Sequence, residues 1–493
     1  MSSRIVIDAE RVGGDIDPKL FGGFLEHLGR AIYEGIYDPA SSLSDERGIR
    51  KDTLAALREL GATIIRYPGG NFLSGYHFLD AVGPKDKRPV RRDLAWRSTE
   101  SNQFGPNEFI EYCRELKTEP MLGVNLGTGT IDEAGAFVEY CNAPAGTFYG
   151  DLRVSHGYRT PHAVEYWCLG NEMDGPWQIG HLEANEYARK AREAAKIMHW
   201  HDPSLKLILC GSSHLNMPTF PEWDRLSLET CWDQVDYLSL HHYTGNREED
   251  TPSYLARAID FEAHINNLTA TLGYVKAKLR SKHDVYLSWD EWNVWYRARA
   301  GDGDWAEAPH LLEEVYNLED ALVVAQWMNV FLRHSRVLKI ACLAQLVNVI
   351  APILTRPDGL IKQSIFYPFQ FFRQYAVGTA LDALVKSPTY ETGQYGSVPV
   401  LDVSASRDEA SGKWAVFVVN RRMDGPEPVE LDVRGMAASG PVQVLQLAGN
   451  DPKAANTFEQ PSAVAPTNLG AHALQNGKLS LNLPAMSFTV ITG

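Results

Sequence analysis

The sequence predicts a (β/α)₈ barrel followed by a smaller, antiparallel β-sandwich domain. Between about residue 20 and residue 350, eight short apolar runs alternate with segments of helical spacing. Several of these runs are continuously apolar, which is typical of parallel strands that are buried on both faces. After about residue 385 the pattern changes to period-two alternation interrupted by Gly, Asn, Asp and Pro, which indicates antiparallel strands.

The expected barrel strands lie at residues 21–25, 63–67, 120–126, 164–169, 206–210, 235–241, 284–289 and 340–347. Helical patterns separate them. One helical face carries Phe109, Ile110 and Cys113, and Gly61 follows another at the position of a helix C-cap. Strand–helix alternation repeated eight times favours a closed barrel. A doubly wound open sheet is the alternative, but it would bring a Gly-rich phosphate loop that this sequence does not resemble.

Three segments make up the predicted domain organisation. Residues 17–384 form the barrel, and residues 385–493 form the C-terminal β-sandwich, which we expect to be jelly-roll-like. Ile5, Ile7 and Ala9 alternate with polar residues ahead of the barrel. We therefore expect residues 1–16 to supply an extra strand that completes the sandwich.

Composition disfavours several classes of protein. The formal net charge of −15 disfavours nucleic-acid partners. The sequence has no run of about 18 apolar residues, so we expect no membrane span. Residues 1–8 lack the basic and apolar stretches of a secretory signal. The six cysteines show no CxxC pair and no regular spacing, so we expect buried free thiols in a reducing compartment. Together these features predict a cytoplasmic protein.

Polar residues stand where the predicted strands end. In a barrel of this kind, catalytic side chains lie at the carboxyl ends of the strands. The fourth strand runs into Asn171-Glu172 and the seventh into Asp290-Glu291. Glu172 and Glu291 are 119 positions apart, or about three βα units, which suits the fourth and seventh barrel positions. We therefore expect the two glutamates to face the same mouth of the barrel.

A pair of carboxyl groups at one mouth can hydrolyse a glycosidic bond. One carboxylic acid protonates the departing oxygen, and a carboxylate opposite attacks or stabilises the anomeric carbon. We expect Glu172 to be the acid/base and Glu291 the nucleophile. Asn171 is placed to reach the sugar hydroxyl next to the anomeric carbon. Arg66, at the end of the second strand, is placed to keep the nucleophile ionised, and Tyr243 can donate to the same carboxylate.

Two other chemistries find less support. A divalent-metal isomerase would recruit His27, Asp290 and His241, but no metal-ligand spacing supports it. His241 and His242 are adjacent in a strand, so their side chains point to opposite faces. A serine hydrolase would need a Gly-x-Ser-x-Gly elbow, which we do not find. We therefore expect neither a metal nor a cofactor.

Five motifs follow one another along the chain: FLEHLGR at residues 24–30, RYPGGNF at 66–72, GNE at 170–172, HHY at 241–243 and WDEWN at 289–293. With NTFE at residues 456–459, they resemble those of family 51 glycoside hydrolases, which are mainly intracellular α-L-arabinofuranosidases. The resemblance spans essentially the whole chain. It implies a retaining double displacement with a covalent arabinosyl-enzyme intermediate.

The resemblance also implies which residues bind the substrate. Glu172 and Glu291 match the acid/base and the nucleophile. Residues that hold an arabinofuranose in the −1 subsite are matched by Glu26, Asn71, Asn171, Tyr243 and Gln345. Trp96 matches an aromatic residue near the leaving group, and Trp295 either walls the same pocket or packs in the core. The family often forms hexamers, so the resemblance implies a homo-oligomer.

The expected function is release of terminal non-reducing α-L-arabinofuranosyl residues from arabinose-containing oligosaccharides such as those of arabinan and arabinoxylan. A five-membered ring fits a short closed pocket in which Glu26 and Asn71 cap the distal hydroxyls. A site built to bind a hydroxyl rejects analogues that lack it by about 10⁴-fold or more. A β-xylosidase or endoglucanase is the alternative, decided by the loop from about Tyr296 to His310. A non-catalytic sugar-binding protein would be expected to lack one glutamate or Arg66.

Overall fold

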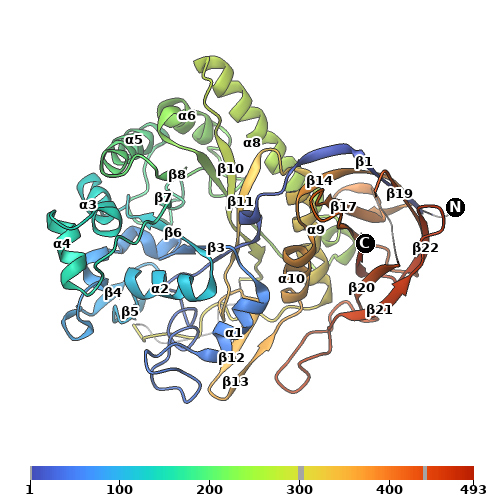
Figure 1. The fold of residues 1–493 in the computed structure, drawn as a ribbon, viewed down its shortest axis with the longest axis horizontal. Coiled ribbons are helices and arrows are strands. Elements are labelled where there is room, and N and C mark those ends of the chain that lie inside the picture. The colour runs from blue at the N-terminus through green and yellow to red at the C-terminus, as the bar shows by residue number, and fades with distance from the viewer. Residues whose placement is uncertain (1–2, 298–304, 437–440) are drawn as a thin grey trace.

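Eight parallel strands close into a barrel in the computed structural model, which describes residues 3–297, 305–436 and 441–493 (Figure 1). Around the barrel the order is β10-β11-β2-β3-β6-β7-β8-β9. The bounds are β2 Gly22–Phe24, β3 Ile64–Tyr67, β6 Glu119–Val124, β7 Tyr166–Leu169, β8 Lys206–Leu209, β9 Tyr237–Thr244, β10 Tyr286–Val294 and β11 Leu338–Ala344. Each strand lies at one of the eight predicted runs, so the predicted barrel is confirmed.

Two strands are longer than predicted. The sequence indicated ends at residues 241 and 289, but β9 continues to Thr244 and β10 to Val294. The reason is that polar side chains near the carboxyl ends of these strands point into the barrel mouth, where they bind one another. Tyr243 and Glu291, which lie beyond the predicted ends, therefore belong to strands and not to loops.

Helices surround the barrel, with bounds α1 Lys51–Leu60, α2 Pro106–Leu116, α3 Ile131–Asn142, α4 Phe148–Ser155, α5 Ala184–His201, α6 Glu222–Cys231, α7 Thr251–Tyr254, α8 Ala258–Leu279, α9 Leu318–Arg333 and α10 Phe366–Tyr375. Gly61 ends α1 as predicted, with a φ of 79° and its N–H donated to the carbonyl of Leu57. Phe109, Ile110 and Cys113 are the buried face of α2. Among the described helices, none is both long and apolar enough to cross a membrane.

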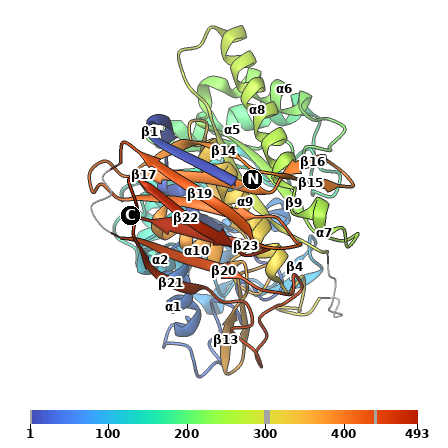
Figure 2. The same cartoon turned by 90° about the vertical axis from the view of Figure 1, so that its right-hand side faces the viewer.

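A nine-stranded sheet forms the second domain, in the order β21-β20-β23-β18-β17-β14-β1-β19-β22 (Figure 2). Its strands are β1 Ser3–Asp15, β14 Thr379–Lys386, β17 Leu401–Arg407, β18 Trp414–Asn420, β19 Glu427–Arg434, β20 Val442–Ala448, β21 Thr467–His472, β22 Lys478–Leu483 and β23 Ser487–Thr492. The N-terminal strand β1 completes this sheet as predicted. However, β1 runs parallel to β19, so the sheet is not wholly antiparallel. The predicted boundary between residues 384 and 385 falls inside β14, where adjacent apolar residues replace a clean alternation.

The sheet has two apolar faces with different partners. On one face Phe417 and Phe488 stack on Phe372 of α10, with ring centroids 4.1 Å and 5.6 Å apart. On the other face, residues from strands near both ends of the sheet, such as Leu431 and Val444, share one core. The sheet therefore curls over its own core while it packs on α9 and α10. All 15 side chains of α9 from Leu318 to Leu332 are buried.

Three short hairpins extend from these two layers. They pair β4 Arg91–Asp93 with β5 Ser98–Glu100, β12 Ile353–Arg356 with β13 Gly359–Lys362, and β15 Thr389–Thr392 with β16 Gly396–Pro399. The tip of the β4–β5 hairpin carries Trp96, and Asp93 holds it by accepting from the backbone N–H groups of Ala95 and Trp96. The six cysteines are free and buried, as predicted.

Candidate active site

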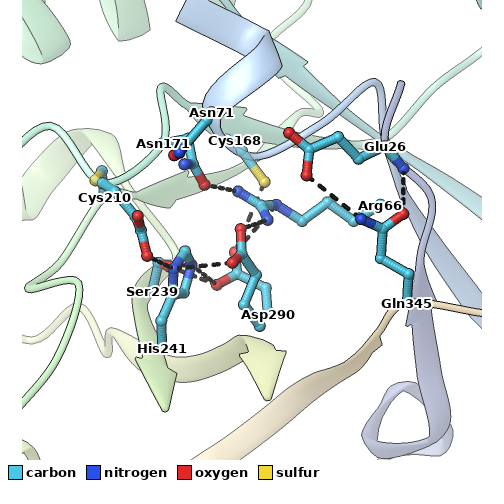
Figure 3. Close-up of polar contacts among 12 residues, drawn as sticks. Glu26, Arg66, Asn71, Cys168, Asn171, Cys210, Ser239, His241, Asp290 and Gln345 are labelled. Atoms are coloured by element: carbon cyan, nitrogen blue, oxygen red, sulfur yellow. Dashed lines mark hydrogen bonds and ion pairs between the residues drawn. The ribbon is translucent and has the colours of Figure 1, made fainter. Parts of the chain in front are cut away.

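Six barrel strands bring polar side chains together at one mouth (Figure 3). Strand β2 leads to Glu26 and β3 carries Arg66. Asn171 and Glu172 follow β7, His241 and Tyr243 lie on β9, Asp290 and Glu291 lie on β10, and Gln345 follows β11. These side chains come from segments far apart in the sequence, so closure of the barrel assembles the site.

Glu291 is held by two donors. Arg66 Nη1 lies 2.6 Å from its Oε1, and the Tyr243 hydroxyl donates to its Oε2 across 2.8 Å. The Glu291 side chain is only 7% exposed. The guanidinium and the hydroxyl on its two oxygens stabilise the negative charge that an attacking carboxylate carries.

A shift in strand register sets the direction of Glu291. The pairing of β10 with β9 is irregular between Ser288 and Glu291. Regular alternation would send Asp290 and Glu291 to opposite faces of the strand, but both face Arg66 here. The Asp290 carboxylate lies 3.8 Å from Arg66 Nε. The irregularity therefore adds a second buried carboxylate under the site.

Glu172 stands on a tight turn after β7. Its φ is +43°, which is uncommon for a residue with a side chain, and Gly170 before it has a φ of +85°. Trp177 donates its indole N–H to Oε2 of Glu172 across 2.6 Å, and His241 Nδ1 lies 2.9 Å from Oε1. A Glu172 oxygen, a Glu291 oxygen and His241 Nδ1 all lie within 4.8 Å of one another. That short separation matches retaining glycosidases, whose carboxyl groups are about 5–5.5 Å apart, and leaves too little room for the inverting arrangement.

His241 is a buried cation between three carboxylates. Burial lowers its pKa, but the charge of Glu291 and hydrogen bonds with Asp290 and Glu172 outweigh burial and raise the pKa to about 10. Asp290 in turn has its pKa lowered, because Arg66 and His241 more than offset its burial. The trio of Glu172, His241 and Glu291 is the one cluster with metal-ligand spacing among the described residues. A protonated imidazole has no lone pair to offer a metal, so these residues fit an ion-pair network better than a metal site.

Glu26 and its neighbours form a separate polar group on the β2 side. Glu26 accepts from the backbone N–H of Phe72 and from the indole of Trp96, both at 3.0 Å. Gln345 forms two hydrogen bonds with Glu26. The Gln345 side chain accepts from the backbone N–H of Glu26 at 2.9 Å and donates to Glu26 Oε2 at 3.4 Å. Burial, followed by the charge of Glu291, raises the pKa of Glu26 to about 8. This shift favours the neutral carboxylic acid, which is the form that can donate a hydrogen bond.

Asn71 and Asn171, both labelled in the close-up, are linked through Gln178 (Figure 3). Asn171 accepts from Arg66 Nη2 across 2.6 Å and donates to Gln178 across 3.4 Å. Gln178 also donates to the backbone carbonyl of Asn71. Between these residues the backbone itself lines the site, since a Cβ on Gly70 would stand 3.0 Å from Glu291 Oε1 and 3.3 Å from Glu26 Oε2.

The rim of the site beyond Tyr243 includes Trp295, which directly follows β10. Trp295 is partly buried and packs edge-on against the Tyr243 ring, with centroids 5.3 Å apart. Of the segment from Tyr296 to His310 that was expected to decide specificity, residues 298–304 lie outside the described residues. Trp305 is described, and its backbone N–H donates to the carbonyl of Arg97 on the β4–β5 hairpin.

Sequence reasoning missed four residues of the site. His241 and Asp290 were weighed only as metal ligands, and Trp177 and Gln178 were not singled out. For His241 a signal existed, because it stands two residues before Tyr243 on one strand and so shares its face. For Asp290, Trp177 and Gln178 the signal was absent, since a register shift and a loop conformation place them.

Comparison with known proteins decides the family. Residues 56–260 match the family described as α-L-arabinofuranosidase 1 domain, and residues 290–487 match the α-L-arabinofuranosidase C-terminal domain. An intracellular exo-α-(1→5)-L-arabinofuranosidase of Bacillus subtilis is 46% identical over 493 residues, covering 99% of this chain and 98% of the relative. The chain belongs to the α-L-arabinofuranosidases of glycoside hydrolase family 51.

Other relatives agree with this assignment. An exo-α-(1→6)-L-arabinofuranosidase of Bifidobacterium longum is 42% identical over 507 residues, covering 99% of this chain and 97% of the relative. The solved structure of a family 51 α-L-arabinofuranosidase from Bifidobacterium longum matches with a TM-score of 0.95 and 37% identity, covering 99% of each chain. The family predicted from the motifs is confirmed. The enzyme is an α-L-arabinofuranosidase, and retention is general for its family.

Proposed function

We propose that the enzyme removes terminal α-L-arabinofuranosyl residues by double displacement, with Glu291 as nucleophile and Glu172 as acid/base. The observation that carries the two roles is the difference between the surroundings of the two glutamates. Glu291 binds a guanidinium and a hydroxyl inside the barrel. Glu172 binds the indole of Trp177, whose side chain is 50% exposed, at the open side from which a leaving group departs.

The geometry supports two chemical steps. In the first, Glu291 attacks the anomeric carbon, the glycosidic C–O bond breaks, and Glu172 gives its proton to the departing oxygen. The product is an ester between arabinose and Glu291. In the second, Glu172 takes a proton from water, the water oxygen bonds to the anomeric carbon, and the Glu291 carboxylate is released.

The remaining predicted residues are assigned to the −1 subsite. We assign Asn171 to the hydroxyl next to the anomeric carbon, and Glu26, Asn71, Tyr243 and Gln345 to the ring and its distal hydroxyls. Trp96 reaches Glu26 from the β4–β5 hairpin, so we place it at the rim, toward the leaving group. The relatives named exo-acting support exo action over internal cuts. No metal or cofactor takes part in these steps.

The substrate class and setting are also proposals. We assign arabinose-containing oligosaccharides from arabinan or arabinoxylan as substrates. The relatives from Bacillus subtilis and Bifidobacterium longum are named for (1→5) and (1→6) linkages respectively. The six free thiols and the relatives named intracellular support a cytoplasmic enzyme. We further propose a homo-oligomer, a hexamer by family resemblance, which light scattering of the purified protein measures.

The test measures nitrophenol release from the α-L-arabinofuranoside, the β-xyloside and the β-glucoside. We expect fast turnover of the arabinofuranoside by the wild type, loss of it in Glu291→Ala, and rescue of Glu172→Ala by azide with an arabinosyl azide product. Glu193→Gln, on the exposed surface of α5, is the matched control. Turnover of the xyloside or glucoside alone would overturn the substrate. A rapid fall in the viscosity of linear arabinan would overturn exo action.

A further inference from the structure

His241 lies between the two proposed catalytic glutamates. Its Nδ1 is 2.9 Å from Glu172 Oε1 and 3.5 Å from Glu291 Oε2, and its side chain is 3% exposed. Tyr243 and Arg66 bind Glu291, and Trp177 binds Glu172. Of these four side chains, His241 is the one with a ring nitrogen within 3.5 Å of both carboxyl groups.

The other ring nitrogen of His241 is held by Asp290. His241 Nε2 lies 3.2 Å from Asp290 Oδ1, and the hydroxyl of Ser239 also bonds to that carboxylate. Asp290 is 1% exposed and also faces Arg66 Nε. The charged groups that face the ring are therefore Glu172 from the β7 loop and Asp290 and Glu291 from β10, with Arg66 of β3 beyond Asp290. On the far side of β9, the pKa of His264 from α8 is lowered, first by burial and also by the charges of His214 and His241.

The negative charge of the site moves during a double displacement. Before the reaction Glu291 carries the charge and Glu172 holds a proton. In the arabinosyl-enzyme, Glu291 is a neutral ester and Glu172 is the carboxylate. Hydrolysis of the ester returns the charge to Glu291. A fixed cation that serves only one glutamate would therefore leave a buried charge without its partner in half of the cycle.

We propose that His241 is a positioning residue that donates its Nδ1–H to Glu291 and Glu172 in alternation, following the negative charge, while Asp290 holds the ring. The inference rests on the proposed function, because it needs these two glutamates in these two roles. The N–H lies within reach of both oxygens, so a small change in ring direction transfers the hydrogen bond. Both half-reactions then have the same cation beside the developing or departing charge.

This arrangement separates His241 from its neighbours. Loss of Tyr243 removes a contact with Glu291 alone, and loss of Trp177 removes a contact with Glu172 alone. Loss of His241 removes contacts with both. The inference therefore predicts a kinetic pattern in which only the His241 variant, or a variant of its anchor, slows arabinosylation and dearabinosylation together.

The experiment compares His241→Asn and Asp290→Asn with Tyr243→Phe and Trp177→Phe in the full-length enzyme. Single-turnover release of dinitrophenol measures formation of the arabinosyl-enzyme, and the steady-state rate after the burst measures its hydrolysis. For His241→Asn we expect both rates to fall by about 10²-fold, the loss typical of one preorganised donor.

The outcomes are distinct. A His241→Asn variant in which only one step slows, or in which both stay within about threefold of the wild type, overturns the inference; threefold is under 1 kcal/mol. Asp290→Asn keeps the imidazole of His241 but removes the carboxylate that holds it, so this variant must also slow both steps. It keeps the inference testable if His241→Asn fails to fold. Near-ultraviolet circular dichroism checks the fold of both. Failure of the proposed function shows differently, as a wild type that forms no arabinosyl-enzyme.

Discussion

Trp177 donates its indole N–H to Oε2 of Glu172 while His241 occupies Oε1, so both oxygens of the proposed acid/base face a ring N–H group. Ring N–H groups on both oxygens suit Glu172 when it carries the negative charge. That form suits the second step, in which Glu172 accepts a proton from water. The first step needs a proton on Glu172, and the half-exposed Trp177 is the contact that can open as a substrate enters.

Replacing Trp177 with Phe removes this donor and keeps most of the aromatic surface. We expect hydrolysis of the arabinosyl-enzyme to slow by about tenfold, since a hydrogen bond to a charged group contributes about 1.5–3 kcal/mol and solvent exposure reduces it. Trp200→Phe is the matched control, because Trp200 lies near the end of α5 and is 79% exposed. An unchanged rate of this step in the Trp177 variant would contradict the role of the indole.

Arg66 binds two side chains of the site at once through its guanidinium group. Its two terminal nitrogens lie 2.6 Å from Glu291 Oε1 and 2.6 Å from Asn171 Oδ1. A lysine keeps the charge but offers one nitrogen, which cannot reach both residues in the same geometry. We expect Arg66→Lys to lower kcat/KM for the nitrophenyl arabinofuranoside by about 10²-fold or more. Arg225→Lys on the surface of α6 provides the comparison, and a similar activity in the two variants would argue against the fork.

Gly70 tests how closely the backbone approaches the reacting carbon. A Cβ added to Gly70 would lie 3.0 Å from Glu291 Oε1. A Cβ added to the nearby Gly75 would meet only Ile179 Cδ1, at 3.9 Å. We expect Gly70→Ala to lose at least about 10²-fold in kcat/KM, the scale of a small misplacement of the substrate. Gly75→Ala should stay near the wild-type rate. Equal rates in the two variants would show that the sugar does not pass Gly70.

Glu26 gives a prediction for stability as a function of pH. Its pKa is about 8 in the folded enzyme, because of burial and the Glu291 charge, against an ordinary value of 4.5. Between these values the unfolded chain has lost the proton that the folded enzyme keeps, so this group makes unfolding more favourable as the pH rises from 4.5 to 8. We expect Glu26→Gln to lose less stability than the wild type between pH 5 and pH 8, measured by urea unfolding.

A matched control separates this effect from general titration. Glu193→Gln changes an exposed carboxylate on α5, and its pH dependence should follow that of the wild type. If Glu26→Gln and the wild type change in parallel over this range, Glu26 is ionised in the folded enzyme and cannot donate a hydrogen bond to a sugar.

Buried histidines give a prediction of the opposite sign. Burial first, followed by nearby positive charge, lowers the pKa of His264 to about 3. The unfolded chain binds a proton on this residue below pH 6.5 that the folded enzyme does not, so stability falls as the pH drops from 6.5 toward 3. We expect His264→Gln to lose less stability than the wild type between pH 7 and pH 5. A parallel loss in both proteins would show that other groups control acid unfolding.

The strands were predictable from the sequence because burial on both faces makes them continuously apolar. Their ends were not, since the polar residues Asp290 and Glu291 interrupt the apolar run although the barrel mouth buries them. The glutamate pair was predictable because position along a barrel strand fixes which mouth a side chain faces. The partners of the pair depend on a register shift at Asp290 and on the loop that returns Trp177 to Glu172. Neither feature has a local sequence signal.

The place of β1 has a consequence for the order of events during synthesis. This strand is translated before the barrel, yet its two neighbours in the sheet, β14 and β19, end at residues 386 and 434. Until the ribosome has passed them, β1 has no edge to join, and its backbone N–H and C=O groups stay unpaired. The barrel lies between in the chain and can close on its own local contacts. The sheet that is made after the barrel therefore pairs with a strand that is made before it, so the barrel is connected to the sheet at both of its ends.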